Sequence, residues 1–506
     1  MKMSRIEDFI KNEGSVFPGK TYAEELLMPV FNDQRDYLFH AMFDIHRAHV
    51  IMLSEQKIIK EEEAKTMLDG IRKVAQTDLE QLTYQPQFED LFFMMEAKIG
   101  EEIGHELAGK IHIGRSRNDM GVAMYRLVLR GHMLQLIGYA NHLSEAFLVQ
   151  ADKHTETYIT GYTHTQPAQP TTIGHYFLAI YDVLQRDIGR LWAAYETVNQ
   201  SPLGAAALTT TGFPISRNRT AELLGFESVI ENSYDSIGGA DYLLETATAI
   251  MTCMVNTGRW IQDFLQHVTR EFGTFHVADP YVQVSSIMPQ KRNPVSIEHS
   301  RSIASSAYGD ALAAMNMIHN TPFGDIVDTE DDLQPHLYRA FSNAGRVMKL
   351  MYAVISTLKV NEEHTKKMAA KSSITVTELA DTLSRDYEIS FRKAHSIASH
   401  IAKRSIGEGK ELYDWDTQDI NKIINEFVAV NLTEDEWKKI ISPEYFVEIR
   451  SIQGGPSPKE VTRMIVKRKQ KLEQQLHEYK GIVEAMNDGR MALIDYGRYG
   501  KEGSEF

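Results

Sequence analysis

Residues 171–198 read TTIGHYFLAIYDVLQRDIGRLWAAYETV, and this stretch decides what kind of fold to expect. Its large apolar residues recur at intervals of three and four, the spacing of one helix face: Phe177, Tyr181, Leu184, Ile188, Leu191, Tyr195 and Val198. The same spacing runs through residues 243–268, and both stretches exceed the length of a typical globular helix. Proline is absent from 87–166, 215–279 and 336–442, and alternating strand patterns are scarce. We therefore expect an all-α protein with a central bundle of long helices.

Composition narrows the class of protein. The chain has 506 residues, 43% of them hydrophobic and 24% charged, which is ordinary for a globular enzyme with two to four domains. Its formal net charge of −15 disfavours binding to nucleic acids or to anionic membranes. No apolar run of about 18 residues predicts a membrane span, and the start of the chain does not resemble a secretory signal. The one cysteine, Cys253, is expected to be a buried inert thiol, and we expect a cytoplasmic protein.

The most polar loop of the chain is VSSIMPQKRNP, residues 284–294. Two prolines prevent a continuous helix, and Asn293 with Pro294 is predicted to begin the long helix that follows. The loop gathers hydroxyls, cations and amides, which suits the capture of a small anion beside a hydroxyl that can exchange a proton. Taken alone, it could equally be an ordinary surface loop.

Two further clusters are as polar as this loop. GRSRND at 114–119 combines guanidinium forks, which suit carboxylates, with neutral Ser and Asn donors, although a solvated helix start would look similar. GYTHTQPAQP at 161–170 contains His164, and histidine is the residue type that most often transfers protons in enzymes, although a lone histidine is more often structural. The 19 histidines are scattered without the spacing of metal ligands. A reaction on a small dicarboxylate without cofactor or metal fits these clusters best.

These clusters, in this order and among long helices, resemble the aspartase/fumarase superfamily, and within it the argininosuccinate lyase branch. The resemblance runs from about Phe31 to about Lys469. It rests on GRSRND at 114–119, GYTH and QPAQP within 161–170, PLG at 202–204 and SSIMPQKRNP at 285–294. Four separated motifs make it specific.

The resemblance implies the architecture and the assembly. An N-terminal helical domain (1–113), a central long-helix domain (114–365) and a C-terminal helical domain with a charged extension (366–506) are expected. Four subunits would pack their central helices into a common core, and each active site would take its motifs from three different chains.

The resemblance also implies the chemistry, which is reversible anti elimination of fumarate from an N-substituted aspartate. Ser286 would be the base, and Lys291 with Asn293 would grip the carboxylate that takes up charge. His164, held by Glu298, would orient the substrate or handle the proton of the leaving amine. The loop 284–291 would close over the substrate. The expected substrate-binding residues are Ser116, Arg117, Asn118, Thr163, Ser285, Met288, Gln290 and Asn293, together with Asp325 and Glu330.

The chain departs from the family pattern at four places. Phe92 stands where the family has a histidine, Val284 replaces a glycine before the two serines, and Arg292 replaces the second lysine of a pair. The family's Tyr, Gln and Lys that hold the arginine half become Asp325, Glu330 and Leu333. The residues for the succinyl half therefore persist, while those for the arginine half do not.

Three hypotheses remain open at this point. The first is a lyase like argininosuccinate lyase whose amine half is not ordinary arginine, and the acidic run at 325–332 could suit a cationic amine. The second is a lyase of aminopolycarboxylates such as ethylenediamine-disuccinate. The third is a non-catalytic relative of the crystallin type, which the joint presence of Ser286, Lys291, Asn293 and His164 disfavours.

Overall fold

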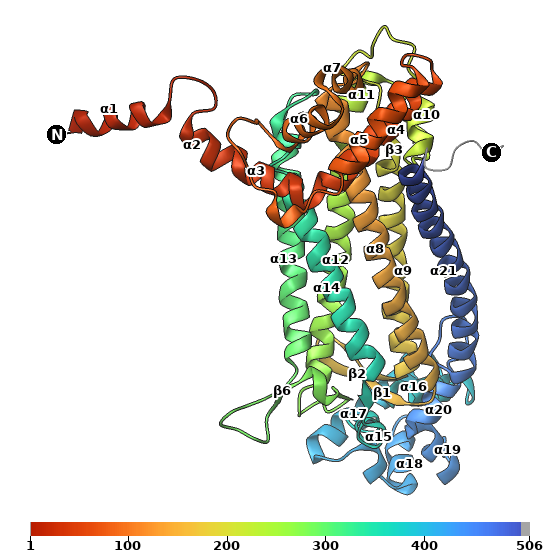
Figure 1. Cartoon of the computed structure of the whole chain (residues 1–506). Coiled ribbons are helices and arrows are strands. Elements are labelled where there is room, and N and C mark those ends of the chain that lie inside the picture. Colours follow the sequence, from red (N-terminus) through yellow and green to blue (C-terminus); the bar gives the residue numbers. More distant parts are fainter. Residues whose placement is uncertain (1, 497–506) are drawn as a thin grey trace.

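Five long helices form the centre of the molecule (Figure 1). The computed structural model of the chain describes residues 2–496, with side chains from Ile6 onward. The helices form a closed ring, in which α8 packs on α9, α9 on α12, α12 on α13, α13 on α14, and α14 on α8. Their bounds are α8 (Arg117–Lys153), α9 (Ile173–Val198), α12 (Asp241–His267), α13 (Val295–Ile318) and α14 (Gln334–Thr357). The prediction of an all-α fold with a central bundle of long helices is confirmed.

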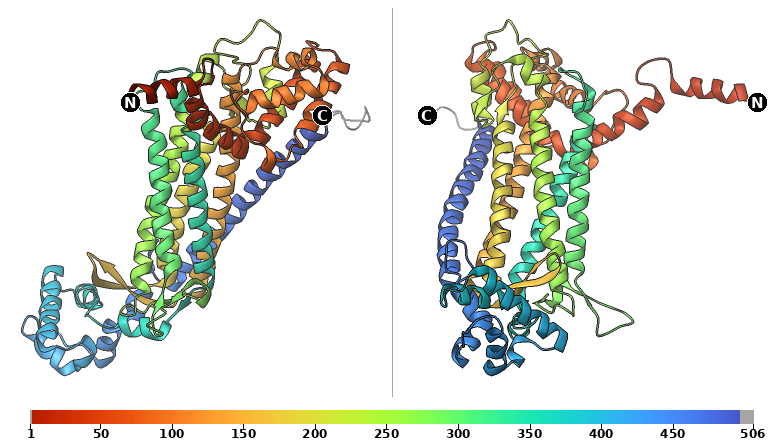
Figure 2. Two further views of the ribbon diagram at one scale, coloured as in Figure 1. Left: turned by 60° about the vertical axis from the view of Figure 1, so that its left-hand side comes forward. Right: turned by 180° about the vertical axis from the view of Figure 1, so that it is seen from behind.

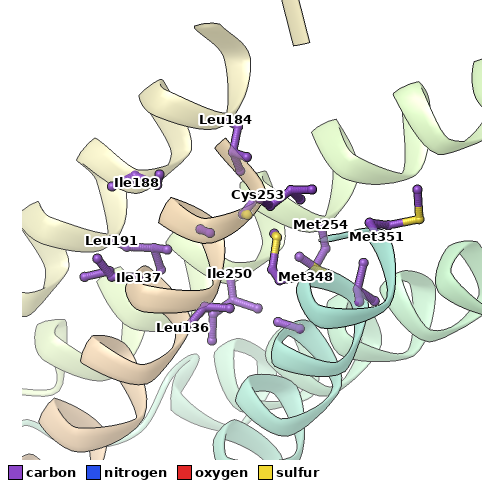
Figure 3. Close-up of a cluster of buried hydrophobic side chains, with 14 of the residues drawn as sticks. Leu136, Ile137, Leu184, Ile188, Leu191, Ile250, Cys253, Met254, Met348 and Met351 are labelled. Atoms are coloured by element: carbon purple, nitrogen blue, oxygen red, sulfur yellow. The ribbon is translucent and has the colours of Figure 1, made fainter. Parts of the chain in front are cut away.

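The interior of the ring is filled by the apolar stripes of its helices. Figure 3 shows Leu184 and Ile188 of α9 facing Ile250 and Cys253 of α12, with methionines of α14 beside them. All these side chains are buried. Cys253 is fully buried, as expected, and burial raises the pKa of its thiol. Burial of such stripes is the main force that holds long helices together, because each helix alone is marginal in water.

A set of shorter helices covers the end of the bundle where α8 begins (Figure 1). Its core is a second cluster of buried residues, centred on Phe43, Ile51, Met67 and Met95. An arm that precedes these helices projects away from the rest of the chain (Figures 1 and 2). The arm contains α1 (Lys2–Glu13), α2 (Lys20–Tyr22) and α3 (Met28–Asp33), and the covering helices are α4 (Phe39–Glu55), α5 (Glu61–Val74), α6 (Leu91–Ile103), α7 (His105–Gly109), α10 (Arg217–Leu223) and α11 (Ser233–Gly238).

Six short helices lie at the opposite end of the bundle, and the four within residues 376–441 share a core of their own. In this core Trp437 Nε1 donates to the carbonyl of Trp415 at 3.2 Å, and Trp415 Nε1 donates to Ser405 Oγ at 2.9 Å. The helices are α15 (Glu362–Ala369), α16 (Val376–Arg385), α17 (Phe391–Glu408), α18 (Thr417–Asn425), α19 (Glu434–Ile441) and α20 (Pro443–Glu448).

The last helix, α21 (Pro458–Asp495), runs back along the whole bundle beside α8 and α9 (Figure 1). Leu472 joins the core of the bundle, and Leu493 joins the core of the N-terminal helices. The helix approaches α8 so closely that a Cβ at Gly138 would lie 2.5 Å from Tyr479 Oη. The predicted domain limits stay a prediction, but α21, which falls in the third range, packs on the first two.

The strands are short and occur in pairs. The longest pair, β1 (Tyr158–Thr163) and β2 (Gln166–Thr172), forms an antiparallel hairpin between α8 and α9. The other pairs join β3 (Gln200–Ser201) with β4 (Ser228–Val229), β5 (Phe275–His276) with β8 (Lys359–Val360), and β6 (Gln283–Val284) with β7 (Arg292–Asn293).

The start of α13 and, among the described residues, the absence of a membrane-crossing helix both bear on predictions made from the sequence. The helix after the polar loop begins one residue later than predicted, because Pro294 is the N-cap of α13 and Asn293 belongs to β7, paired with Gln283. Within residues 2–496, none of the helices combines the length and apolar character that crossing a bilayer requires.

We predict that Leu472→Ala lowers the free energy of unfolding by about 2–4 kcal/mol, because it leaves a cavity between α21 and the bundle. The neighbouring exposed change, Lys471→Ala, should alter it by no more than about 0.5 kcal/mol. Urea denaturation followed by far-UV circular dichroism measures both. Equal midpoints for the two variants would contradict the packing of α21 on the bundle.

Candidate active site

The first turn of α8 carries the GRSRND cluster and is built as a tightly capped helix start. Ser116 is the N-cap residue, its side chain accepts from the Asn118 N–H, and its own N–H donates to Asp119 Oδ1 at 3.0 Å. Asp119 Oδ2 also accepts from the N–H groups of Gly204 and Ala206, at 2.9 and 3.0 Å. Asp119 therefore fixes the loop after PLG against the helix start, where the helix dipole favours an anion.

Two side chains of this turn already contact carboxylates of the same chain. Asn118 Nδ2 donates to Asp325 Oδ2 at 2.6 Å. Arg117 Nη1 lies 3.1 Å from Asp90 Oδ2 and 3.4 Å from Glu89 Oε1. The expected succinyl-binding motif and the substituted residue Asp325 thus meet in one place within a single chain.

A cavity of ≈ 330 Å³ opens beside this contact. Its lining combines acidic residues with apolar ones, among them Leu27, Leu38, Met42 and Leu243. Arg117 is the one cation that lines it among the described residues, and it is paired with Glu89 and Asp90. The acidic lining consists of Glu89, Asp90, Asp325, Glu330, Asp331 and Asp332.

The carboxyl groups of this cavity are perturbed by burial and by one another. Burial, then a hydrogen bond and the charge of Asp325, raises the pKa of Glu330 to about 8. Burial also raises the pKa of Asp331, although Gln34 Nε2 and Tyr125 Oη both donate to its Oδ1 at 3.2 Å. Two carboxyls in contact hold a proton between them more readily than either does alone, and a cation between them would displace that proton.

The polar loop projects from the opposite end of the bundle (Figure 1, β6). The pairing of β6 with β7 closes its base, and Arg292 strengthens it by donating to the carbonyl of Val277 at 2.9 Å and by an ion pair with Asp279. Ser285 Oγ accepts from the Met288 N–H at 3.1 Å, and the Lys291 N–H donates to the Met288 carbonyl at 3.0 Å.

The loop presents its chemical groups to the outside of this chain. The side chains of Ser286, Met288, Gln290 and Lys291 are exposed, while Ser285 and Asn293 are half-buried.

The hairpin β1–β2 presents Thr163 and His164 at the same end of the bundle. His164 and Thr165 form the two-residue turn, with φ angles of 50° and 64°. Such a turn matches the twist of the flanking strands but is strained for a β-branched residue. A bulge at Gly161 and Tyr162 precedes it, and α15 and α20 pack against the strands. The two exposed side chains are therefore held on a rigid support.

The site residues predicted from the sequence fall into two groups at opposite ends of the bundle. Arg117, Asn118, Asp325 and Glu330 line one cavity, with Ser116 beside them at the start of α8. Helix α8, with its 37 residues, spans about 55 Å and ends just before β1. Thr163, His164, Glu298 and the loop 285–293 lie at that far end. Within the described part of one chain, His164 and Glu298 share this end but form no ion pair. One subunit therefore does not bring the expected catalytic residues to Ser116, Arg117 and Asn118 at the other end.

Several residues of the cavity did not stand out in the sequence. Tyr125 lies seven residues after Asn118, two turns along the same face of α8, so helical spacing could have indicated it. Gln34 comes from a distant segment and carried no comparable signal, whereas Glu89 and Asp90 belong to the family motif in which Phe92 replaces a histidine. Phe92, where the family has a histidine, is buried and packs edge-on against His112, with a centroid distance of 5.2 Å. At that position, packing has replaced a polar side chain.

Comparisons with known proteins show what this chain is similar to. Residues 27–309 match the family described as lyase, and residues 373–448 match the argininosuccinate lyase C-terminal family. Argininosuccinate lyase 2 of Agrobacterium fabrum is 39% identical over 451 residues, covering 88% of this chain and 90% of that protein. Argininosuccinate lyase of Methanocaldococcus jannaschii is 35% identical, covering 89% and 92%.

The chain is also similar to solved structures. An EDDS lyase variant with bound fumarate is 31% identical and covers 91% of each chain, with a TM-score of 0.83. EDDS lyase in complex with formate is 30% identical and covers 96% of each chain, also with a TM-score of 0.83. A class II fumarase from Schistosoma mansoni, at 15% identity and a TM-score of 0.65, shares the fold.

We predict that Glu330→Gln changes how stability depends on pH. Because the pKa of Glu330 is raised from 4.5 to about 8, its protonated form stabilises the folded chain below pH 4.5, and this contribution is lost as the pH rises through about 8. The parent protein should therefore lose thermal stability relative to Glu330→Gln between about pH 5 and about pH 9. The exposed control Asp328→Asn should follow the parent at each pH. A difference between Glu330→Gln and the parent that does not vary with pH would contradict this assignment.

Proposed function

Because this chain belongs to the argininosuccinate lyase branch of the aspartase/fumarase superfamily and is a carbon–nitrogen lyase that releases fumarate, we propose the following division of the reaction among its residues. Ser286 removes the proton next to a carboxylate of an N-substituted aspartate. That proton is weakly acidic, so the doubly charged aci-carboxylate that forms must be stabilised by fixed donors and cations. Lys291 and Asn293, at the end of the same loop, supply them. Ser285, Met288 and Gln290 complete the wall that this loop places over the substrate.

Elimination then breaks the bond between carbon and nitrogen on the opposite face, and the amine leaves as fumarate forms. His164, paired with Glu298, orients the substrate or supplies the proton that the leaving nitrogen takes up. Thr163, Ser116 and Asn118 hold the succinyl carboxylates, and Arg117 adds positive charge beside them. A serine base needs its pKa lowered, and the Lys291 ammonium together with backbone N–H groups of the loop is the available means.

The active site is shared between subunits of a homotetramer. The separation of the two residue groups by the length of the bundle supports this, because about 55 Å is far beyond the reach of one small substrate. Two bundles packed side by side in opposite directions would bring the start of α8 of one subunit to the hairpin and loop of others. The exposure of His164, Ser286 and Lys291 supports the same arrangement. The homotetramer and a cytoplasmic location both stay predictions.

The amine half of the substrate is a cation other than arginine. The observation that carries this proposal is the contact between Asn118 and Asp325 at the mouth of the acidic cavity, at 2.6 Å. If Asn118 binds the succinyl half of the substrate, the substituent on the substrate nitrogen lies next to the carboxylates that line the cavity. The similarity to EDDS lyase structures supports an amine of the ethylenediamine type, and the apolar residues that line the cavity would accommodate a methylene chain.

We predict that Ser286→Ala lowers kcat roughly a thousandfold, the usual size of the loss when a general base is removed. Ser396→Ala, an exposed serine of the C-terminal helices, should leave kcat unchanged. The appearance of fumarate absorbance measures the rate, and circular dichroism checks that both variants are folded. Turnover by Ser286→Ala close to that of the parent would remove Ser286 from the mechanism.

Sharing of the active site has its own test. Ser286→Ala and Asn118→Ala should each be inactive alone. After the two proteins are unfolded together and refolded, some sites receive an intact loop from one chain and an intact α8 from another, so part of the activity should return. A mixture that stays as inactive as its components, while forming tetramers by sedimentation, would contradict shared sites.

The identity of the amine is tested with a panel of substrates. We expect fumarate release from ethylenediamine-disuccinate or a related cationic aspartate derivative, with much slower release from argininosuccinate and adenylosuccinate. The carboxylates that line the cavity should attract a diamine and should not hold the amino-acid end of arginine. Rapid turnover of argininosuccinate would refute the altered amine half, although the reaction class would stand.

A further inference from the structure

The N-terminal arm, residues 2–38, carries an apolar surface that its own subunit leaves uncovered. Helix α1 packs against α2 and extends away from the bundle (Figures 1 and 2). Ile6, Phe9 and Ile10 share one face of α1 and are 59%, 55% and 61% exposed. Val16 and Phe17, just after the helix, continue this surface at 79% and 65% exposure. Contiguous exposed apolar side chains of this size mark interaction surfaces in proteins.

The arm has a defined geometry at its bend. The Glu13 carboxylate accepts from both the N–H and the hydroxyl of Thr21, at 3.0 and 2.5 Å, so the end of α1 is joined to the start of α2. These hydrogen bonds hold the pKa of Glu13 below its usual value. The bend therefore sets the direction in which the apolar face of α1 points.

The other end of the arm forms a wall of the acidic cavity. Tyr22, Leu26, Leu27 and Val30 line it. Gln34, at the base of the arm, donates to Asp331 at 3.2 Å and accepts from the N–H of Leu91 at 3.2 Å. One continuous segment thus connects the uncovered apolar face of α1 to the pocket proposed for the amine.

We propose that the apolar face of α1 docks on a second copy of this chain, and that this docking holds the arm as one wall of the amine pocket. The choice of a second copy as the partner rests in part on the proposed shared site, and the effect of docking on the amine rests on the proposed function.

Three observations favour a second copy as the partner. Residues proposed for substrate binding at the start of α8 and those proposed for catalysis lie at opposite ends of the bundle, so the proposed shared site requires neighbouring copies. The arm leaves the molecule past α13, on the side away from α21 (Figures 1 and 2). A shallow pocket on α12 and α13, lined by Met254, Val255 and Tyr308 together with Arg259 and Arg301, offers a surface on which a second copy could pack.

Cross-linking tests the docking directly. Cys253 is fully buried and burial raises the pKa of its thiol, so Lys11→Cys places one reactive thiol on the polar face of α1. Labelled with a benzophenone maleimide and irradiated, this protein should give covalent dimers on a denaturing gel. Adding Phe9→Asp should remove the dimers. Adding Asn12→Asp, which puts the same charge outside the face formed by Ile6, Phe9 and Ile10, should leave them.

Several results would overturn the docking. Photoproducts confined to one chain would do so, as would dimers that persist with Phe9→Asp. Capture of the arm by phospholipid vesicles or by an unrelated protein, without dimers, would assign the face to another partner. Cross-linking needs no turnover, so its outcome is independent of the proposed reaction.

Kinetics in the direction of amine addition test the link to the pocket. With fumarate at a fixed concentration, Phe9→Asp should raise the KM for the amine by roughly tenfold, the size of effect common when a buried aromatic anchor is lost at an interface. The KM for fumarate should stay the same in both Phe9→Asp and Asn12→Asp. Equal amine KM values in the two variants would show that docking does not reach the pocket.

Discussion

The closed ring of five long helices is the constraint on which the rest of this structure depends. Its helices stay together because their apolar stripes are buried against one another, and stripes of this length need helices of seven to ten turns. The consequence is distance. The start of α8 and the hairpin that follows its end are held about 55 Å apart by a rigid rod. Chemistry that needs both ends must therefore use more than one copy of the chain, because the stable bundle cannot bend to bring its two ends together.

Each end of the bundle presents a different kind of chemistry. At one end, capped and paired side chains surround a cavity rich in carboxylates, where Asn118 meets Asp325. At the other end, exposed groups lie on a loop and a hairpin whose bases are fixed by strand pairing and by Arg292. The cavity at the start of α8 suits recognition of a charged substrate. The loop and the hairpin suit groups that must enter a neighbouring subunit, because a backbone that is already fixed loses little conformational entropy on binding.

Two segments, helix α21 and the N-terminal arm, connect regions of the chain that lie apart. Helix α21 joins the C-terminal helices to the N-terminal ones, with an ion pair between Arg490 and Asp44 at its far end. The N-terminal arm joins an exposed apolar face to the acidic cavity through Gln34. Helix α21 thus couples the two ends of the bundle, and the arm carries a wall of the cavity, so a contact made on its apolar face can affect that wall.

Much of this molecule is encoded locally. Periodic apolar residues predicted the central bundle, because one face of a helix is read from a few consecutive turns. The polar motifs pointed to the residues proposed for the succinyl half and for proton transfer, since each motif is a short contiguous segment. The loss of the arginine-binding residues could also be seen from the substitutions at Asp325 and Glu330.

What the sequence could not supply were contacts between distant segments. The acidic cavity joins Gln34, Asp90, Tyr125 and Asp331, which lie on four segments that only packing brings together. The raised pKa of Glu330 likewise arises from burial and from a neighbouring carboxylate, neither of which local spacing encodes. Motifs and periodicity thus identified the fold and the reaction class from the sequence alone. The tertiary structure decided which groups share a cavity and which are held a bundle's length apart, because that depends on how whole helices pack.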